Sequence, residues 1–304
     1  MATILVTGAT GFIGGHLVPA LLDAGHRVRC LTRDPSKLDD APWRDRVQVA
    51  RGDVTDWLSL ELAMDGVDRA VYLVHGMDAS PAELVRRELE MARTFRDAAE
   101  RAGLDQLVYL GGLTDDDVVT TMSPHMYARY QAGVELRQGA VPTVELRAAI
   151  VLGAGSASFE MLRAAGRLPL MVAPPWSRTR CQPIAVDDVV AYLVDTLGRD
   201  DLGTRIVEIG GPDVLTYREM GQRYLEVAGA RWRPTVPLLW SPPEASAPAV
   251  SWLSGVDQDL VLPLLTSARR DAVVEDDAAR DLYDIEPVGF DTAVRRALAE
   301  EVHR

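Results

Sequence analysis

The feature that most constrains the fold is a glycine-rich run directly after an apolar segment at the start of the chain. Residues 3–7 read TILVT, residues 8–14 read GATGFIG, and a helical pattern of leucines follows. Glycines let the backbone turn tightly and approach an anionic group, and the helix N-terminus offers free N–H groups and a positive dipole end. We therefore expect a dinucleotide pyrophosphate here, although the spacing is GxxGxxG rather than GxGxxG. The expected contact residues are Gly8, Thr10, Gly11, Phe12, Ile13 and Gly14.

The first half of the chain alternates short apolar runs with longer amphipathic stretches. The expected strands are 3–7, 27–32, 47–50, 70–74, 107–110 and 143–146, and residues 83–102 have the spacing of a long helix. Continuous apolar strands separated by helices indicate a parallel sheet covered on both faces. The prediction is an α/β doubly wound parallel sheet of the Rossmann type.

The pattern becomes less regular after about residue 150. We predict a dinucleotide-binding domain over 1–150 and a smaller substrate-binding part over 151–304, with segments near 181–212 returning to the main sheet. Residues 168–183 are rich in proline and are expected to form a loop. Apolar residues beyond the sixth strand are candidates for a substrate pocket, with core packing as the alternative: Phe159, Met161, Leu162, Met171 and Trp176.

The end of the second strand selects the cofactor. A carboxylate there would bind the ribose 2′-hydroxyl and repel a 2′-phosphate. Here Arg33 comes first and Asp34 only after it, so a guanidinium is placed to bind a 2′-phosphate, and Lys37 is one helical turn further on. We therefore expect NADP(H) rather than NAD(H). Asp53 and Val54, after the third strand, are expected along the adenine edge.

Composition limits the partners and the chemistry. The net charge of −13 disfavours nucleic acid and anionic membranes as main partners, and no apolar run has the roughly 20 residues of a membrane span. Two cysteines and no recognisable leader favour a reduced, cytoplasmic setting. Lys37 is the only lysine, so lysine chemistry could involve no other residue. There is no HExxH, the histidines are scattered, and Asp115, Asp116 and Asp117 resemble a solvated loop, so no metal site is expected.

Together these motifs resemble the short-chain dehydrogenase/reductase superfamily, and more narrowly its extended and atypical, NmrA-like branches. The resemblance rests on TGATGFIG at 7–14, the Arg33 position, GDV at 52–54 and PIAVDDV at 183–189. It covers about residues 2–230 well. Members of these branches include reductases, isomerases and proteins that bind NADP(H) without turnover. The resemblance therefore implies the fold and the cofactor more strongly than it implies an activity.

The resemblance also implies an active site, and this chain departs from it. The family places a Ser or Thr after the fifth strand and Tyr-x-x-x-Lys on the next helix, where lysine lowers the tyrosine pKa. Here Gly112 takes the serine position, Tyr127 matches the tyrosine, Gln131 replaces the lysine, and Glu135 holds the family's downstream position. A neutral glutamine gives no Coulombic help, so another arrangement, with Arg129 or a water chain, would have to assist proton transfer. The same resemblance places Val74, His75 and Gly111 beside the cofactor.

Three functions remain open at this point. The leading hypothesis is an NADP(H)-dependent oxidoreductase that acts on a small organic substrate, a carbonyl or a conjugated ring. The degenerate active site favours a second hypothesis, a non-catalytic protein that senses NADP(H). The third is an isomerase or epimerase that regenerates its nicotinamide in each turnover. The oligomeric state is open, with a homodimer among the alternatives.

Overall fold

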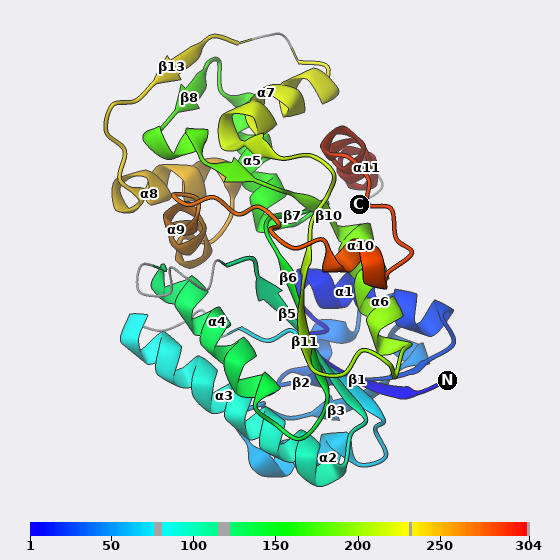
Figure 1. Cartoon of the computed structure of the whole chain (residues 1–304). Coiled ribbons are helices and arrows are strands. Elements are labelled where there is room, and N and C mark those ends of the chain that lie inside the picture. Colours follow the sequence, from blue (N-terminus) through cyan, green and yellow to red (C-terminus); the bar gives the residue numbers. More distant parts are fainter. Residues whose placement is uncertain (76–80, 115–121, 231–232, 303–304) are drawn as a thin grey trace.

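The computed structural model describes residues 1–75, 81–114, 122–230 and 233–302. Its centre is a seven-stranded sheet with the order β11-β6-β5-β4-β1-β2-β3 (Figure 1). All neighbouring strands are parallel, with Leu5 opposite Arg29 and Val108 opposite Val144 as examples of the register. The strands are β1 (Thr3–Thr7), β2 (Arg27–Thr32), β3 (Gln48–Arg51), β4 (Arg69–Tyr72), β5 (Gln106–Gly112), β6 (Thr143–Ala148) and β11 (Arg205–Ile209). The predicted doubly wound parallel sheet is confirmed.

Helices cover both faces of this sheet. One face packs on α1 (Phe12–Asp23) and α6 (Val186–Leu197). The other packs on α2 (Trp57–Met64), α3 (Pro81–Ala102) and α4 (Pro124–Arg137). This explains the unbroken apolar strands: all five residues of β1 are buried, because both sides of the strand face a helix layer.

The C-terminal part lies beyond the carboxyl ends of β5 and β6, in the upper half of Figure 1. It contains β7 (Val151–Leu152), α5 (Ala157–Arg167), β10 (Ile184–Ala185), β12 (Leu215–Thr216), α7 (Tyr217–Val227), α8 (Pro243–Ser254), α9 (Gln258–Ser267) and α11 (Phe290–Val302). The short helix α10 (Ala278–Leu282) returns to the main sheet and packs against β11. β11, from the segment near 181–212, pairs with β6 in the main sheet.

Residues 168–183, expected as a loop, instead contain two short strands and a turn of 3₁₀ helix. β8 (Met171–Ala173) pairs in parallel with β13 (Thr235–Pro237), and β9 (Arg180–Cys181) pairs antiparallel with β12. The 3₁₀ turn, η4, covers Pro175–Arg178. The expectation was wrong because each strand finds its partner far along the chain, and the local proline content carries no information about such pairing.

Buried charges connect β6 with α4. Glu145, on β6 between β11 and β5, accepts hydrogen bonds from Arg147 and from Arg137, each at 2.8 Å. Its side chain is 1% exposed, so the two guanidinium groups compensate a charge that would otherwise be costly to bury. A Cβ on Gly111 or Gly133 would lie 2.9 or 2.5 Å from a carboxylate oxygen of Glu145. These two glycines make the room that the buried ion cluster occupies.

Candidate functional site: a nucleotide cradle beside a large apolar cavity

The glycine-rich run, residues 8–14, forms a tight turn between β1 and α1, and we call this turn the cradle. Gly8 has φ of +72°, a conformation that favours glycine. A Cβ on Gly14 would lie 2.3 Å from the carbonyl oxygen of Gly8, so helix and turn approach more closely than any other residue allows. Gly11 caps α1 without any side-chain hydrogen bond, and the first turn has no acidic residue. The N–H groups and positive dipole end of α1 are thus available to an anion.

The expected contact residues of this run differ in exposure. Thr10 and Gly11 are exposed at the tip of the turn, Phe12 and Ile13 are half-buried, and Gly14 is buried against the turn itself. Phe12 also points toward the C-terminal part, because its ring would meet a Cβ placed on Gly153 at 2.8 Å. The cradle and the segment after β7 are therefore in contact.

The end of β2 lies beside this turn, because β1 and β2 are adjacent parallel strands. Arg33 and Lys37 are both exposed there, with Lys37 on the short 3₁₀ helix η1 (Pro35–Leu38). Asp34 is occupied locally: its Oδ1 accepts hydrogen bonds from the Ser36 amide at 3.1 Å and from the Ser36 hydroxyl at 2.6 Å. These hydrogen bonds lower the pKa of Asp34.

Four other expected cofactor residues have clear structural roles. Asp53 Oδ1 accepts hydrogen bonds from the Thr55 amide and hydroxyl, both at 2.9 Å, and so shapes the turn after β3. Val54 is buried in the core below α2 and α3, and Val74 packs against the same core. Gly111 leaves space for Glu145. Their backbones lie near the carboxyl ends of β3, β4 and β5, which is the edge of the sheet where such folds bind ligands.

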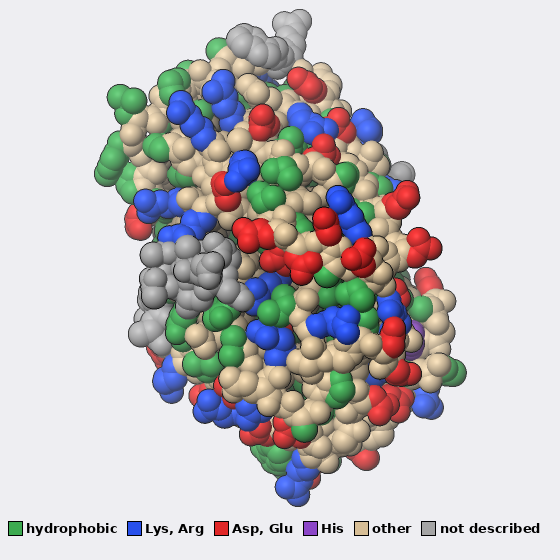
Figure 2. Space-filling model, viewed as in Figure 1, with side chains coloured by type: hydrophobic (Ala, Val, Ile, Leu, Met, Phe, Trp, Pro, Cys, Tyr) green, Lys and Arg blue, Asp and Glu red, His purple; other side chains and the backbone are tan. Residues whose placement is uncertain are grey.

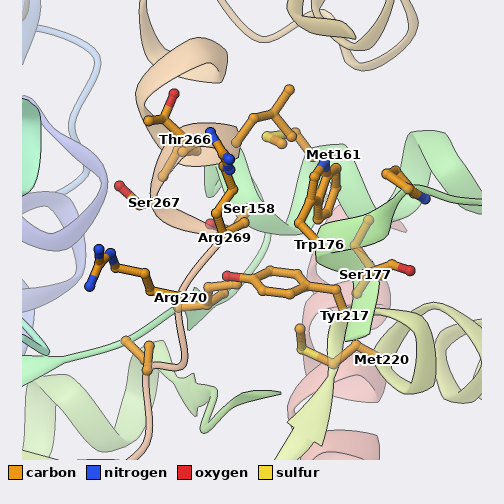
Figure 3. A pocket seen from close by; sticks show the side chains of 18 of the residues that line it. Ser158, Met161, Trp176, Ser177, Tyr217, Met220, Thr266, Ser267, Arg269 and Arg270 are labelled. Carbon is orange, nitrogen blue, oxygen red and sulfur yellow. The ribbon is translucent and has the colours of Figure 1, made fainter. Parts of the chain in front are cut away.

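A cavity of about 1220 Å³ lies between that edge and the C-terminal part. At the sheet end it is lined by Gly112, Thr114, Ala148 and the first turns of α4. At its far end Tyr217 lies between Trp176 and Met220, with Met161 close to Trp176 (Figure 3). Arg269 and Arg270 line the same cavity. Trp176 and Tyr217 meet edge to face, with ring centroids 5.7 Å apart. The cavity exceeds the roughly 300–1,000 Å³ of a typical small-molecule site.

Four of the five apolar candidates from the sequence line this cavity, namely Met161, Leu162, Met171 and Trp176. Phe159 does not, because its ring is completely buried in the core against Tyr224. Sequence reasoning missed Tyr217, Ser267, Arg269 and Arg270, which also line the cavity. These residues come from segments that approach only when the C-terminal part folds back on itself.

The structure does not bring Tyr127 and Gln131 to the cavity. The residues of α4 that line it are Pro124, His125, Met126 and Arg129. Side chains four residues apart share a helix face, whereas those two apart point about 200° away from each other. The buried stripe of α4 comprises Ala128, Ala132 and Leu136. His125 and Arg129 adjoin this stripe, and Tyr127 and Gln131 lie on another side of the helix, half-buried.

His125, Arg129 and His75 form a polar cluster at the sheet end of the cavity. Burial lowers the pKa of His125 to about 4, with a further contribution from Arg129. Burial also lowers the pKa of His75 well below its usual range, and Arg129 and His125 add to this effect. Both imidazoles are therefore neutral at pH 7. Arg129 Nη2 donates to the Leu110 carbonyl at 2.9 Å, while its buried Nε has no hydrogen-bond partner among the described residues.

The side chain of Met126 lies against the family's serine position. A Cβ on Gly112 would lie 2.5 Å from Cε of Met126, so a serine there requires the Met126 side chain to move. Thr114, two residues on, lines the cavity and its buried hydroxyl has no partner within the described part of the chain. Of the two departures from the family pattern, Gly112 therefore lines the cavity and Gln131 does not.

Within the described ranges, no group of three or more His, Cys, Asp or Glu side chains is arranged to hold a metal ion. Residues 115–117, the run of three aspartates, lie outside those ranges. Among the described helices none is both long and apolar enough to cross a bilayer.

Comparison with known families identifies the region that contains the cradle. Residues 8–142 match a family of domains described as NAD(P)H-binding. The matched region begins at the first glycine of the cradle and includes β2, β3, β4 and β5 completely. The chain contains an NAD(P)H-binding Rossmann domain.

Relatives of this NAD(P)H-binding chain include oxidoreductases of different kinds. Over 118 residues it is 34% identical to a 3 beta-hydroxysteroid dehydrogenase/Delta 5→4-isomerase of Mycobacterium tuberculosis, a match to 36% of this chain and 31% of that enzyme. The chain therefore spans about a third of the length of these first relatives. It is 29% identical over 238 residues to a ceramide reductase of Caulobacter vibrioides, covering 76% of this chain and 72% of the relative.

Solved structures share the fold over the whole chain. One is the triphenylmethane reductase of Citrobacter sp. complexed with NADP(H), with a TM-score of 0.74 and 20% sequence identity. The superposition covers 97% of this chain and 99% of that one. At this identity the similarity establishes the common architecture, including the part that follows the dinucleotide-binding domain.

Proposed function

We propose that this chain is an NADPH-dependent reductase of a bulky, largely apolar substrate that carries a carbonyl or conjugated group. The observation that carries the proposal is the cavity. One end lies at the carboxyl ends of β5 and β6, and His125 and Arg129 line it. The other end is an aromatic and methionine-rich chamber from the C-terminal part. A protein that only binds its cofactor has no need of such a chamber.

The choice of NADPH is supported by the end of β2. Arg33 is exposed directly beside the cradle, and Lys37 follows on η1. The neighbouring carboxylate of Asp34 has one oxygen committed to Ser36. A guanidinium binds a phosphate through charge-assisted, bidentate hydrogen bonds, which a ribose hydroxyl does not offer. The cradle residues Gly8, Gly11 and Gly14 would hold the pyrophosphate, and the bound cofactor would supply hydride.

The role proposed for the polar cluster is to stabilise charge on the substrate. Arginine side chains are positively charged in proteins, and the Nε–H group of Arg129 is an unused donor. A neutral His125 offers one N–H group. Donors that are already in place in a site with little water stabilise an oxygen on which negative charge develops, and this is often the largest single contribution to catalysis. The sequence-based proposal of Tyr127 as proton donor competes with this one, and it requires that helix α4 present a different face.

The test uses purified protein, NADPH and a panel of bulky aromatic ketones, enones and cationic dyes, with loss of NADPH absorbance as the readout. Turnover of at least one bulky apolar compound, and little of small aldehydes, is the expected result. An isomerase would convert its substrate without net consumption of NADPH. A sensor would bind NADPH, consume none of it with any compound, and change the protease sensitivity of the segments after residue 150. Either of those results would replace the proposal.

A further inference from the structure

The outer end of the C-terminal part is apolar and nearly free of charge. A quarter of all residues in the chain are charged, yet residues 168–177 and 234–256 contain only one charged residue, Glu244. Several large side chains of these segments are in solvent: Leu239 is 97% exposed, Trp252 83% and Trp240 76%. Figure 2 shows hydrophobic side chains gathered at the edge of the molecule over β13 and the connection to α8.

These side chains belong to adjoining segments. In the β8–β13 pair, Val172 is the register partner of Val236, and both are about 40% exposed. The Leu238 amide continues the pairing by donating to the Ala173 carbonyl at 2.9 Å. Leu239 and Trp240 follow at once, and α8 begins three residues later. We call residues 236–240 together with Val172 the apolar rim. An exposed apolar patch of this kind marks a surface that binds a protein, a membrane or a ligand.

The apolar rim is continuous with the cavity. Val172 and Leu238 line it, as do Ser241 and Leu253 on the segment that follows. The same short stretches of chain therefore face the cavity with some side chains and solvent with others. Leu239 and Trp240 do not line the cavity, so their exposure is not explained by the site.

Three of the four residues that directly flank the two charge-poor segments are arginines, although the chain as a whole carries −13; the fourth is Asp257, and the acidic Glu244 lies inside the second segment. Arg167 and Arg178 flank the first charge-poor segment, both exposed and with no ion pair to a described residue, and Arg233 precedes the second. The whole-chain charge led us to expect no membrane partner. At physiological ionic strength, however, charges further away than about 8 Å are largely screened, so the local charges matter more at a surface contact.

We propose that the apolar rim docks on the surface of a phospholipid bilayer. Leu239 and Trp240 insert at the interface, where tryptophan is the favoured aromatic residue, and the flanking arginines meet headgroup phosphates. The bilayer then faces the same segments that wall the cavity, so an apolar substrate can pass between them without crossing water. The docking itself rests on the exposed residues, and only the passage of substrate rests on the proposed function. A second copy of the chain is the alternative occupant that the experiment must separate.

The experiment is co-sedimentation of the full chain with vesicles of phosphatidylcholine containing one quarter phosphatidylglycerol. The variant replaces both insertion residues, Leu239→Ser with Trp240→Ser. The matched control replaces two leucines of α2 that are 59% and 69% exposed, Leu58→Ser with Leu62→Ser. We expect the wild type and the control to bind, with a blue shift of tryptophan emission. The rim variant should partition about tenfold or more weakly, because a leucine and a tryptophan no longer leave water.

Light scattering at several protein concentrations measures the solution mass of the wild type and of the rim variant. Equal solution masses of the wild type and the rim variant, together with the loss of vesicle binding, support the proposal. A wild-type dimer that the rim substitutions convert to monomer shows that a second copy covers the patch, and it overturns the proposal. Vesicle binding that is absent, or that survives the rim substitutions, overturns it as well. None of these readouts depends on turnover, so a failure of the proposed reductase activity is seen separately.

Discussion

Replacement of Arg33 by alanine tests the choice of cofactor. Arg33 is the first residue after β2 and is exposed, so its contact with a 2′-phosphate would be partly screened by solvent. A charge-assisted hydrogen bond contributes about 1.5–3 kcal/mol, and the exposure places this one near the lower end, which is about a tenfold change in Kd. The variant should therefore bind NADPH about tenfold more weakly and bind NADH as before.

The assay is calorimetric titration of NADPH and NADH into three proteins, the wild type, Arg33→Ala and Arg27→Ala. Arg27 is the matched control because it is an exposed arginine at the opposite end of the same strand. Its replacement should leave both affinities unchanged. The preference of the wild type for NADPH over NADH should also decrease as salt is added, since exposed charges are screened. Equal affinity of the wild type for the two cofactors, or a preference that survives Arg33→Ala, would refute the reasoning.

Three further outcomes are expected. Gly11→Val places a β-branched side chain at the exposed tip of the cradle, in a backbone conformation that valine accepts. It should weaken NADPH binding about 100-fold, which equals the loss of one or two charge-assisted hydrogen bonds. The circular dichroism spectrum and the melting temperature should be unchanged. Arg129→Met should lower kcat by about 10²–10³-fold, as removal of an oxyanion donor does, whereas Tyr127→Phe should leave kcat nearly unchanged; the opposite ranking in steady-state assays would restore Tyr127 as the proton donor. Because the pKa of His125 is near 4 in the folded chain, against about 6.5 when unfolded, the unfolded state binds more protons below pH 6.5. Stability should therefore fall as the pH drops from 6.5 to 4, by up to about 3 kcal/mol from this residue, and urea titrations of His125→Gln should show a smaller loss.

The main sheet was predictable because its signals are local. The unbroken apolar run at 3–7, the glycines at 8–14 and the regular alternation up to residue 150 each follow from burial between two helix layers. The pairing of β8 with β13 was not predictable, since it joins three-residue strands more than sixty positions apart. Strands this short have no periodicity of their own.

The choice of which face of α4 is buried shows a second limit of prediction from the sequence. Alignment with the family motif Tyr-x-x-x-Lys selects Tyr127 and Gln131, because the two stand four residues apart on the helix after β5. The pattern within the helix favours a different face: Ala128, Ala132 and Leu136 repeat every four residues and mark the buried side. His125 and Arg129 adjoin that stripe. The information was therefore present in the sequence, in the spacing of small apolar residues rather than in the match to a motif.

The single lysine of the chain stands in solvent on η1, four residues after Arg33. Arginines provide all the other permanently basic side chains. Isotopic methylation of amines would consequently mark one side chain only, beside the expected site of the 2′-phosphate, in addition to the α-amino group. In a spectrum of the methylated protein, the resonance of Lys37 would act as a resident probe of which nucleotide is bound, without any engineered label.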